Sequence, residues 1–475
     1  MSFTPAPIPV RTASLPVIPV SPPNTSTGRL AIAQERFQFQ DLPSLASRVC
    51  QAILSGSGFS SADRARLQED MAALRFIPAG NTLTAGVYSL RPNCCTLGSP
   101  SPDRFSHVLE DCRTLWQTRT GVGIDLSQFP DPVFALWTLS RENHATTLLE
   151  GEKSRPKRGN MATLDIEHPR AIDFIRLKKT LPQGTISNFN ISLRVTDSWM
   201  RQHGHMKNPV WRELVDAAWS CGDPGLFFLD RVHIPFGVDR RQMTLVPCGE
   251  QSMSPYETCN LGALNLAQFV SPHREIQWSQ LSTTAGLAAR FLDQVINCTE
   301  FAVQQCQEAT AKHRRVGLGV MGFADMLQAL GGIPYGSRTA QRLATRLGKC
   351  ITKSARAQLP AAASVTCVAP TGGITLLTDN QGWGIEPFFA ESTTLRPQDH
   401  LAIQAAWQRG MENAISKTVN LPRHANKQEV ADTFSRAWKL RCKGVTVYRD
   451  GSSSMQPISL ERKPSARGGQ CTKCD

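Results

Sequence analysis

Apolar positions along the chain follow two periods. Between residues 30 and 75 they recur at three-to-four spacing, as in the segment 41–54, and this spacing predicts helices. From residue 76 to residue 448, short runs rich in β-branched and aromatic residues alternate with longer amphipathic segments. Examples are the predicted strands 188–196 and 444–448 and the predicted helices 400–415 and 429–440. Alternation over this length predicts an α/β fold, either a barrel or an open parallel sheet.

The two ends of the chain differ in composition from this α/β region. Residues 1–28 contain seven prolines and no acidic residue, which predicts a disordered, Pro-rich arm. Residues 453–475 are polar and rich in Gly, Ser and Pro, which predicts a flexible tail. We therefore expect four parts: the disordered arm 1–28, a helical region 29–75, an α/β domain 76–452 and the tail 453–475.

The overall composition excludes several classes of protein. Of the 475 residues, 41% are apolar and 19% charged, which fits a globular chain rather than a disordered or fibrous one. No window of 18 or more apolar residues occurs and no signal segment opens the chain, so neither a membrane span nor secretion is expected. The 14 cysteines are too few for a disulfide scaffold, so we expect free thiols and a cytoplasmic location.

Basic residues exceed acidic ones, and the formal net charge of +13 suits a polyanionic partner or substrate. The imbalance is strongest after Asp325, because no further acidic residue occurs before Asp379. Six basic residues in this segment recur at three-to-four spacing on one predicted helical face: Arg338, Arg342, Arg346, Lys349, Lys353 and Arg356. Two interpretations stay open, a solvated surface and a surface that attracts a phosphorylated substrate or partner.

Several cysteines stand outside the predicted helices. Cys248 lies between a proline and a glycine in a segment that predicts a tight loop, and Glu250 follows two positions later. Cys94 stands at the start of a predicted strand, and Cys259 comes soon after the Cys248 loop. A thiol and a carboxylate in one loop, together with further thiols, indicate a redox enzyme.

The tail ends in a C-x-x-C pair formed by Cys471 and Cys474. A dithiol on a mobile segment is suited to thiol exchange with other cysteines. Zinc binding is a second interpretation, but a four-ligand site normally needs two such pairs or a Cys/His set, and the tail has one pair. An inert terminus is the third interpretation. We predict no protein-bound metal site.

Two glycine-rich turns are candidates for binding phosphate. The segment 119–125 contains Gly-x-Gly, which by itself is weak evidence of a phosphate site. The segment 369–375 combines two threonines, two glycines and a predicted helix start, so its backbone N–H groups could bind a phosphate. It is not a P-loop, because no Gly-Lys-Ser/Thr follows. An ordinary strand-to-helix turn is the other interpretation.

Together, nine motifs in one order resemble the large catalytic chain of ribonucleotide reductase, and most closely its adenosylcobalamin-dependent class II. The resemblance runs from about residue 75 to residue 452 and includes the C-x-x-C tail. The motifs are RFIPAGNTL (75–83), NCCTL (93–97), KRGNM (157–161), PCGEQ (247–251), SPYETCNLGALNLAQFV (254–270), RRVGLGVMGFADML (314–327), APTGGIT (369–375), GIEPFFA (384–390) and GVTVYRDGS (444–452).

The resemblance implies a ten-stranded α/β barrel of the ribonucleotide reductase and glycyl-radical-enzyme type, with a central finger loop and a small N-terminal helical region. It also implies an activity, the conversion of ribonucleoside di- or triphosphates to 2′-deoxyribonucleotides by thiyl-radical chemistry, for DNA synthesis. Cys248 matches the cysteine that becomes the thiyl radical and removes the 3′ hydrogen. Glu250 matches the carboxylate that takes the proton of the 3′-OH.

The same resemblance implies a path for the electrons. Cys94 and Cys259 match the two cysteines that reduce the substrate and close into a disulfide. Cys471 and Cys474 of the tail would then reduce that disulfide by thiol exchange, and thioredoxin or a similar reductant would restore the tail.

The residues implied to bind substrate lie in five places. They are Thr82, Asn93, Gly121, Val246 and the turn Thr371, Gly372, Gly373, Ile374 and Thr375. Two of them depart from the family pattern: Val246 stands where Asn is usual and cannot make a side-chain hydrogen bond, and Gly373 stands where Thr is usual. Cys95 is expected in the core, on the strand face opposite Cys94. The loop 183–188 stands where family members carry a loop that links base specificity to an allosteric nucleotide.

The radical source follows from the tyrosines. Reductases with a metal subunit pass the radical through paired tyrosines, whereas the four tyrosines of this chain are never adjacent and Tyr448 stands alone in its motif. Adenosylcobalamin is therefore the expected cofactor. A compact class I large subunit that needs a ferritin-like metal radical subunit stays open, as does a nucleotide-binding protein without turnover. Nucleic acid is not an expected partner, and family habit favours a homodimer or a monomer.

Overall fold

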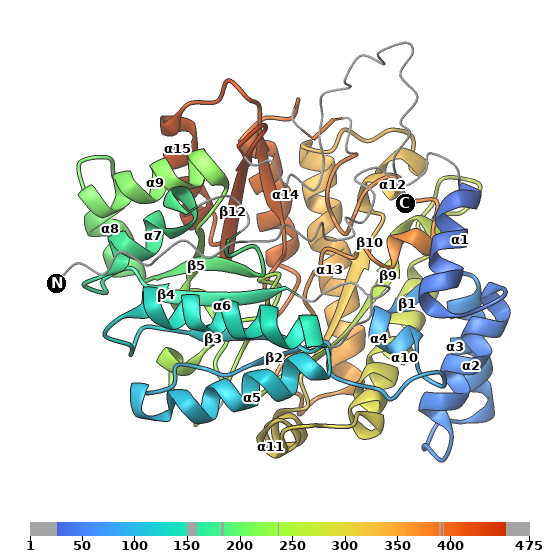
Figure 1. The fold of residues 1–475 in the computed structure, drawn as a ribbon. Helices are drawn as coiled ribbons and strands as arrows, with labels where there is room; N and C mark the ends of the chain where they lie inside the picture. The colour runs from blue at the N-terminus through green and yellow to red at the C-terminus, as the bar shows by residue number, and fades with distance from the viewer. Residues whose placement is uncertain are drawn as a thin grey trace, which may run out of the picture.

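The computed structural model describes residues 26–149, 159–181, 185–235, 237–388, 391–392 and 394–452. The predicted tail with Cys471 and Cys474 lies outside these residues, as does nearly all of the predicted arm. Helices surround a set of strands, and the first helices gather at one end of the molecule (Figure 1).

Three helices begin the described chain: α1 (Ser26–Phe37), α2 (Leu42–Leu54) and α3 (Ser61–Ala72). The side chains of Asp41 and Ser60 accept hydrogen bonds from backbone N–H groups in the first turns of α2 and α3, so a polar residue caps each start. The apolar face of α2 is buried in a core that the long helix α10 (Trp278–Cys298) also lines. These helices occupy the stretch in which the apolar spacing predicts helix.

The first half of the main sheet is parallel. Its strands are β2 (Cys94–Thr96), β3 (Gly121–Asp125), β4 (Asn160–Asp165), β5 (Phe189–Val195) and β6 (Gly225–Phe228). The helices between or after them are α5 (Phe105–Gln117), α6 (Pro132–Leu149), α7 (Ala171–Thr180), α8 (Asp197–His203) and α9 (Pro209–Cys221). Regular strand–helix alternation of this kind produces parallel pairing, because each helix returns the chain to the same edge.

The second half runs antiparallel to the first. It contains β9 (Thr258–Asn265), β10 (Val316–Met321), β11 (Thr418–Leu421) and β12 (Gly444–Arg449), and β1 (Phe76–Pro78) adds to β9. Its helices, after α10, are α11 (Gln304–His313), α12 (Phe323–Ala329), α13 (Arg338–Gln358), α14 (Pro397–Gln408) and α15 (Lys427–Lys439). The halves join where β2 pairs with β9 and where β6 pairs with β12, both antiparallel.

Further pairings connect β10 to the segment that leads into β11. The 10-stranded order is β1-β9-β2-β3-β4-β5-β6-β12-β11, with β10 on the far side of β9. Isolated bridges join Leu318 of β10 to Thr366 and Val368 to Ile415, just before β11. The strand pairings therefore run in a ring, which agrees with the α/β barrel expected from the sequence.

Helix α14 is shorter than the predicted helix 400–415, because it ends at Gln408. Beyond it, Gly410 lies against Gly348 of α13, and a methyl group on Gly410 would stand 2.8 Å from the Gly348 Cα atom. Residues 413–416 instead pair with 366–368, where the N–H of Asn413 donates to the carbonyl of Thr366 at 2.9 Å. Pairing in the ring thus replaces the helical continuation that apolar spacing predicts.

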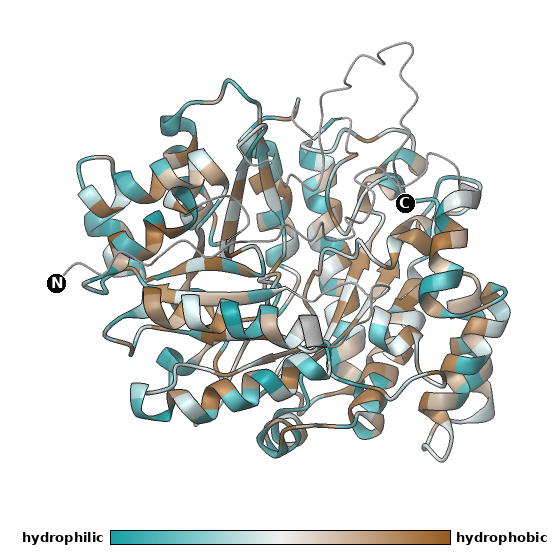
Figure 2. Ribbon diagram, viewed as in Figure 1, coloured by the Kyte–Doolittle hydropathy of each residue, from teal (hydrophilic) through white to brown (hydrophobic). Residues whose placement is uncertain are grey.

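Apolar residues concentrate on the strands and on the helix faces that meet them (Figure 2). Strands β3 and β6 are buried along their whole length, as expected for strands inside an α/β fold. Within the part of the chain that the structure describes, every helix is too short or too polar to cross a bilayer.

Candidate active site

A short hairpin carries the predicted reactive thiol. Its strands β7 (Thr244–Leu245) and β8 (Ser252–Met253) pair antiparallel. At the turn between them, the N–H of Gly249 donates to the carbonyl of Val246 at 2.9 Å, and Gly249 has φ of +72°. Proline is favoured in the second position of such a turn, and glycine accepts the positive φ. The Pro-Cys-Gly sequence therefore builds a tight turn that presents Cys248 with an exposed side chain.

The hairpin contacts the parallel half of the ring very closely. A methyl group on Gly123 of β3 would lie 1.9 Å from the carbonyl oxygen of Leu245, so only glycine admits the hairpin at this depth. The side chain of Asn190 on β5 donates to the carbonyl of Pro247 at 2.8 Å. These contacts make the hairpin the central finger loop that the family resemblance implies.

The other half of the ring holds the opposite strand of the hairpin. The N–H of Ser252 donates to the side-chain oxygen of Asn413 at 3.1 Å. Gln251 Nε2 lies 3.4 Å from the sulfur of Cys367, and a methyl group on Gly317 of β10 would stand 2.3 Å from that Nε2 atom. The finger hairpin is thus fixed between both halves of the sheet.

Cys94 and Cys259 face each other although 165 residues separate them. They are direct partners in the antiparallel β2–β9 pair, and their sulfur atoms are 2.8 Å apart. Both side chains are buried and form no disulfide bond, and Val246 of the finger hairpin packs in the same cluster. A disulfide bond has an S–S distance of about 2.0 Å, so these two thiols need little movement to form one. The structure thus brings the predicted dithiol beside the hairpin that carries Cys248.

Glu250 has an environment suited to proton transfer near neutral pH. Its side chain is 2% exposed, and burial raises the pKa of the carboxyl to about 7. Its Oε2 atom has no hydrogen-bond partner among the described residues. A buried carboxyl with an unpaired oxygen and a pKa near neutrality can act as a general base.

Three of the predicted substrate residues lie on segments close to Cys94. Asn93 is buried, and its carbonyl accepts a hydrogen bond from the N–H of Gly121 at 3.1 Å. Thr82 is buried in α4 (Gly80–Leu83), and Asn81 of this helix donates to the carbonyls of residues 91 and 92. Thr82, Asn93 and Gly121 therefore lie on segments that are bonded to one another next to the dithiol.

The turn 369–375 differs from its prediction in one respect. The N–H groups of Ile374 and Thr375 both donate to the carbonyl of Thr371, which has φ of +61°. The turn leads into a single 3₁₀ turn, Thr375–Leu377, and not into the α-helix start that the sequence predicts. An α-helix dipole is therefore not available to a phosphate here, and two of the backbone donors are already used.

The positive charge of Arg36 lies at the same turn and replaces the missing helix dipole. A methyl group on Gly373 would lie 3.3 Å from Nη2 of Arg36, which comes from α1, and one on Gly372 would lie 3.4 Å from the Trp383 ring. Glycine at position 373, where the family usually has Thr, leaves room for this arginine. The turn can thus offer a phosphate the N–H groups of its glycines and the Arg36 guanidinium.

Val246 is fully buried and packs against Cys94 and Cys259. The valine that replaces the usual Asn therefore forms an apolar wall beside the dithiol. Cys95 is also fully buried, in a different cluster, and its sulfur lies 3.3 Å from that of Cys306. Burial raises the pKa of Cys95 well above the ordinary thiol value, so the thiolate is disfavoured. The prediction that Cys95 is a core residue is confirmed.

Behind the site, Glu257 forms a buried ion pair at the start of β9. Its carboxylate lies 3.1 Å from Nη2 of Arg315 and 2.7 Å from Nδ1 of His313. Burial alone raises the pKa of Glu257, but the Arg315 charge and the His313 hydrogen bond outweigh it and hold the pKa at about 2. This fixed negative charge neutralises an arginine that is fully buried.

Three site residues escape sequence reasoning. Arg36 stands in a helix without any motif, Asn413 falls inside the helix predicted too long, and Cys367 precedes the glycine-rich turn. Each reaches the site only through the folded arrangement. Among the described residues, no group of three or more His, Cys, Asp or Glu side chains is placed to hold a metal ion.

Known proteins of one family are similar to this chain. Residues 205–358 and 385–448 match the family described as "Ribonucleotide reductase, barrel domain". The chain is 35% identical over 402 residues to a vitamin B12-dependent ribonucleoside-diphosphate reductase of Mycobacterium tuberculosis, covering 63% of this chain and 57% of the relative. It is 27% identical over 509 residues to the protein of the same name from Thermoplasma acidophilum, covering 83% of this chain and 66% of the relative.

A shorter match is to a reductase whose name does not mention vitamin B12. Over 141 residues the chain is 33% identical to the ribonucleoside-diphosphate reductase subunit alpha of Chlamydia trachomatis, which covers 28% of this chain and 13% of the relative. These matches confirm the resemblance to ribonucleotide reductase large chains of the B12-dependent class. The chain spans a little more than half the length of the Mycobacterium relative.

Proposed function

We propose that the chain reduces ribonucleotides to 2′-deoxyribonucleotides by thiyl-radical chemistry, for DNA synthesis. The observation that supports this most directly is the Cys94–Cys259 pair, with sulfurs 2.8 Å apart beside the hairpin of Cys248 and Glu250. A protein that only binds nucleotides has no need of a buried dithiol next to an exposed thiol and a carboxyl of raised pKa. The names of the relatives favour diphosphate substrates.

In the proposed reaction each residue has one role. The Cys248 radical removes the 3′ hydrogen of the ribose, and Glu250 takes the proton of the 3′-OH while the 2′-OH leaves as water. Cys94 and Cys259 give up two electrons and two protons and become a disulfide, and the Cys248 thiol returns the 3′ hydrogen. One ribonucleotide and two thiols thus become one deoxyribonucleotide, one disulfide and one water.

Substrate binding is assigned to the groups around this site. We propose that Thr82, Asn93 and Gly121 contact the nucleoside, with Val246 as the apolar wall behind it. The turn Thr371–Thr375 and Arg36 would hold the phosphates, because the guanidinium lies over Gly373. The buried Asn93 and Thr82 side chains would then make hydrogen bonds that water cannot easily replace.

The proposed cofactor is adenosylcobalamin, which supplies the initiating radical when it is bound. Direct radical generation requires a reachable thiol, and the exposed side chain of Cys248 at the hairpin tip fits this requirement. The single Tyr448 of β12 also fits, since transfer from a separate metal subunit uses a tyrosine pair.

The tail would recharge the dithiol. We propose that Cys471 and Cys474, which lie outside the described residues, reduce the Cys94–Cys259 disulfide and are themselves reduced by thioredoxin or a similar protein in the cytoplasm. Replacement of Cys471 by Ser should spare turnover with dithiothreitol and depress turnover with thioredoxin. Equal activity with both reductants would remove the relay role.

A homodimer is the assembly we propose.

The decisive experiment uses the full chain with adenosylcobalamin, dithiothreitol and each ribonucleotide. Deoxynucleotide should form, the Cys248→Ser variant should form none above background, and Cys95→Ser should keep turnover because that thiol faces the core. Circular dichroism of both variants checks that they are folded. Nucleotide binding without turnover under any radical source would indicate a binding protein. Turnover only after a ferritin-like metal subunit is added would indicate the class I alternative.

A further inference from the structure

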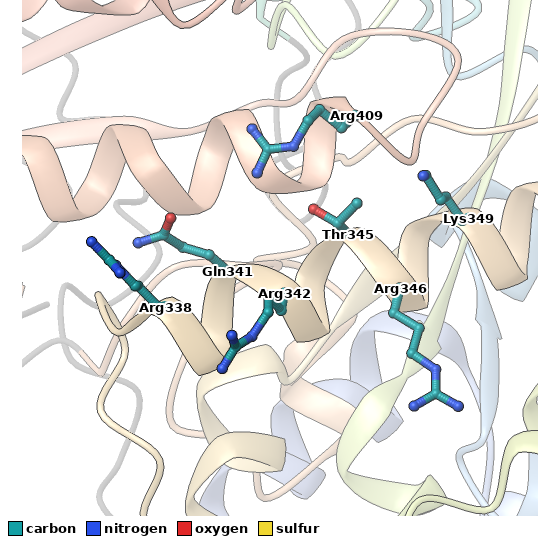
Figure 3. A pocket seen from close by; sticks show the side chains of 7 residues that line it. All are labelled: Arg338, Gln341, Arg342, Thr345, Arg346, Lys349 and Arg409. Atoms are coloured by element: carbon teal, nitrogen blue, oxygen red, sulfur yellow. The ribbon is translucent and has the colours of Figure 1, made fainter.

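A strongly basic groove lies between α13 and the end of α14, with a volume of about 660 Å³. Five cationic side chains line it: Arg338, Arg342, Arg346, Lys349 and Arg409. Figure 3 shows Arg338, Arg342, Arg346 and Lys349 along α13, and Arg409 beside the end of α14. All five side chains are exposed. No residue of the finger hairpin, the dithiol or the turn 371–375 lines this groove.

The helix period and one close helix contact build this groove. Arg338, Arg342 and Arg346 are four positions apart, so they follow one side of α13 at intervals of about 6 Å. Gly348 and Gly410 allow the chain after α14 to approach α13 closely, as described above. This contact brings Arg409 to the groove beside α13, and Thr345 strengthens it because its hydroxyl donates to the carbonyl of Ala406 at 2.9 Å.

None of the five cations forms an ion pair with a residue that the structure describes. Arg356 on the same helix differs, because its charge is neutralised. Its Nη2 atom lies 2.5 Å from Oε2 of Glu412 and its Nε atom 2.9 Å from Oε1. The sequence supplies no acidic residue between Asp325 and Asp379 that could neutralise the groove from α13 itself. Arg346 lies over the Trp278 ring, 4.2 Å from its centre, and so is held in place without losing its charge. Five like charges on one concave surface repel one another unless an anion binds between them.

We propose that this groove binds a small molecule with several linked phosphates, either a nucleoside triphosphate or inorganic tripolyphosphate. Arginine guanidinium groups match phosphate oxygens in two-pronged hydrogen bonds, and several linked phosphates can meet several arginines at once. The volume falls in the range of small-molecule sites. Proteins that bind single-stranded nucleic acid combine such a cationic groove with exposed aromatic rings that stack on the bases, and the exposed aromatic residues of the described chain, Tyr88 and Phe134, do not line this groove.

The test compares charge reversal inside and outside the groove on the same helix. The groove variant combines Arg342→Glu with Arg409→Glu. The matched control is Lys353→Glu, because Lys353 is an exposed cation on α13 that does not line the groove. A milder variant, Arg342→Gln with Arg409→Gln, covers the case in which charge reversal impairs folding, and thermal unfolding of each variant checks stability.

Isothermal titration calorimetry on the full chain measures binding of tripolyphosphate and of ATP at low salt. We expect both groove variants to bind about tenfold more weakly or worse, and Lys353→Glu to bind within about twofold of the wild type. Equal affinity for the two ligands assigns the groove to linked phosphates alone, and tighter binding of ATP assigns it to a nucleoside triphosphate. Binding of neither ligand, equal binding by groove and control variants, or binding only of an oligothymidylate would overturn the proposal.

Discussion

At the scale of single residues, the site depends on small differences in surroundings among similar side chains. Cys94 and Cys95 are neighbours in the sequence, yet strand alternation puts one against Cys259 and the other in the core. Glu250 and Glu257 are both buried, but only Glu257 has an arginine beside it. Burial without a charged partner raises the pKa of Glu250 to about 7, whereas the Arg315 charge and the His313 hydrogen bond hold the pKa of Glu257 at about 2.

The pKa of Glu250 predicts how turnover depends on pH. The base form is the deprotonated one, so turnover should rise with pH between about 6 and 8 and reach half of its plateau near pH 7. A carboxyl with an ordinary pKa would give a flat profile in this range. Steady-state rates across this range, corrected for the reductant's own titration, provide the measurement. Replacement of Glu250 by Gln should remove turnover and the profile together.

The same shift predicts an effect on stability. Because the folded pKa lies above the unfolded one, the contribution of Glu250 to stability is fully present below about pH 4.5 and is lost as pH rises through about 7. The Gln variant avoids this loss. Its free energy of unfolding should therefore exceed that of the wild type at pH 8 by up to about 3 kcal/mol, and the difference should shrink at pH 5. Urea denaturation at the two pH values measures it.

At the scale of elements, glycines decide where strands and hairpins can approach. Gly123 admits the carbonyl of Leu245, and Gly317 admits the side chain of Gln251, so the finger hairpin enters between the two halves. Gly348 and Gly410 do the same for α13 and the chain after α14. A side chain at any of these positions would separate elements that the site or the basic groove needs in contact.

Replacement of Gly123 by Ala should displace the finger hairpin. A methyl group 1.9 Å from a backbone oxygen cannot be accommodated without movement, and the cost should be about 1–3 kcal/mol or more in the free energy of unfolding. The turnover rate should also fall, by about tenfold or more, because Cys248 moves with the hairpin. Gly58→Ala is the matched control, since nothing lies within 4 Å of the added group. Equal unfolding midpoints and rates in the two variants would contradict this account of the hairpin.

At the scale of the whole molecule, the site exists because the sheet joins two parallel halves in opposite directions. The β2–β9 junction sets Cys94 opposite Cys259, and the ring of pairings leaves a centre that the hairpin fills. Glu257 and Arg315 stand beside this junction and link β9 to the start of β10. The ion pair therefore supports the part of the ring on which the dithiol depends.

Replacement of Glu257 by Gln should weaken the whole fold. It leaves Arg315 buried without a counter-charge, which typically lowers the free energy of unfolding by about 3–5 kcal/mol. Glu69→Gln is the control, because the Glu69 side chain is 62% exposed in its pair with Arg75 and should contribute less than about 1 kcal/mol. Because the pKa of Glu257 is lowered, the wild type loses this contribution to stability as pH falls through about 2. The free energies of unfolding of the wild type and of Glu257→Gln should therefore converge in acid. A loss for Glu257→Gln no larger than for Glu69→Gln would contradict the role of the pair.

The amino-acid sequence by itself determined the α/β class, the strands 188–196 and 444–448, the tight turn of Cys248 and the basic face of α13. These follow from local rules, namely residue period, turn chemistry and helix spacing, which need no distant contacts. The family resemblance supplied the barrel and the proposed roles of the thiols.

Tertiary structure alone decided the rest. Only chain pairing sets Cys94 against Cys259, ends α14 at Gln408 and brings Asn413 to the finger hairpin. Burial, which depends on every surrounding element, gave Glu250 its raised pKa, and helix packing added Arg409 to the basic groove. The physical reason is the same in each case: these features arise from contacts between segments far apart in the chain, and no local pattern of residues records such contacts.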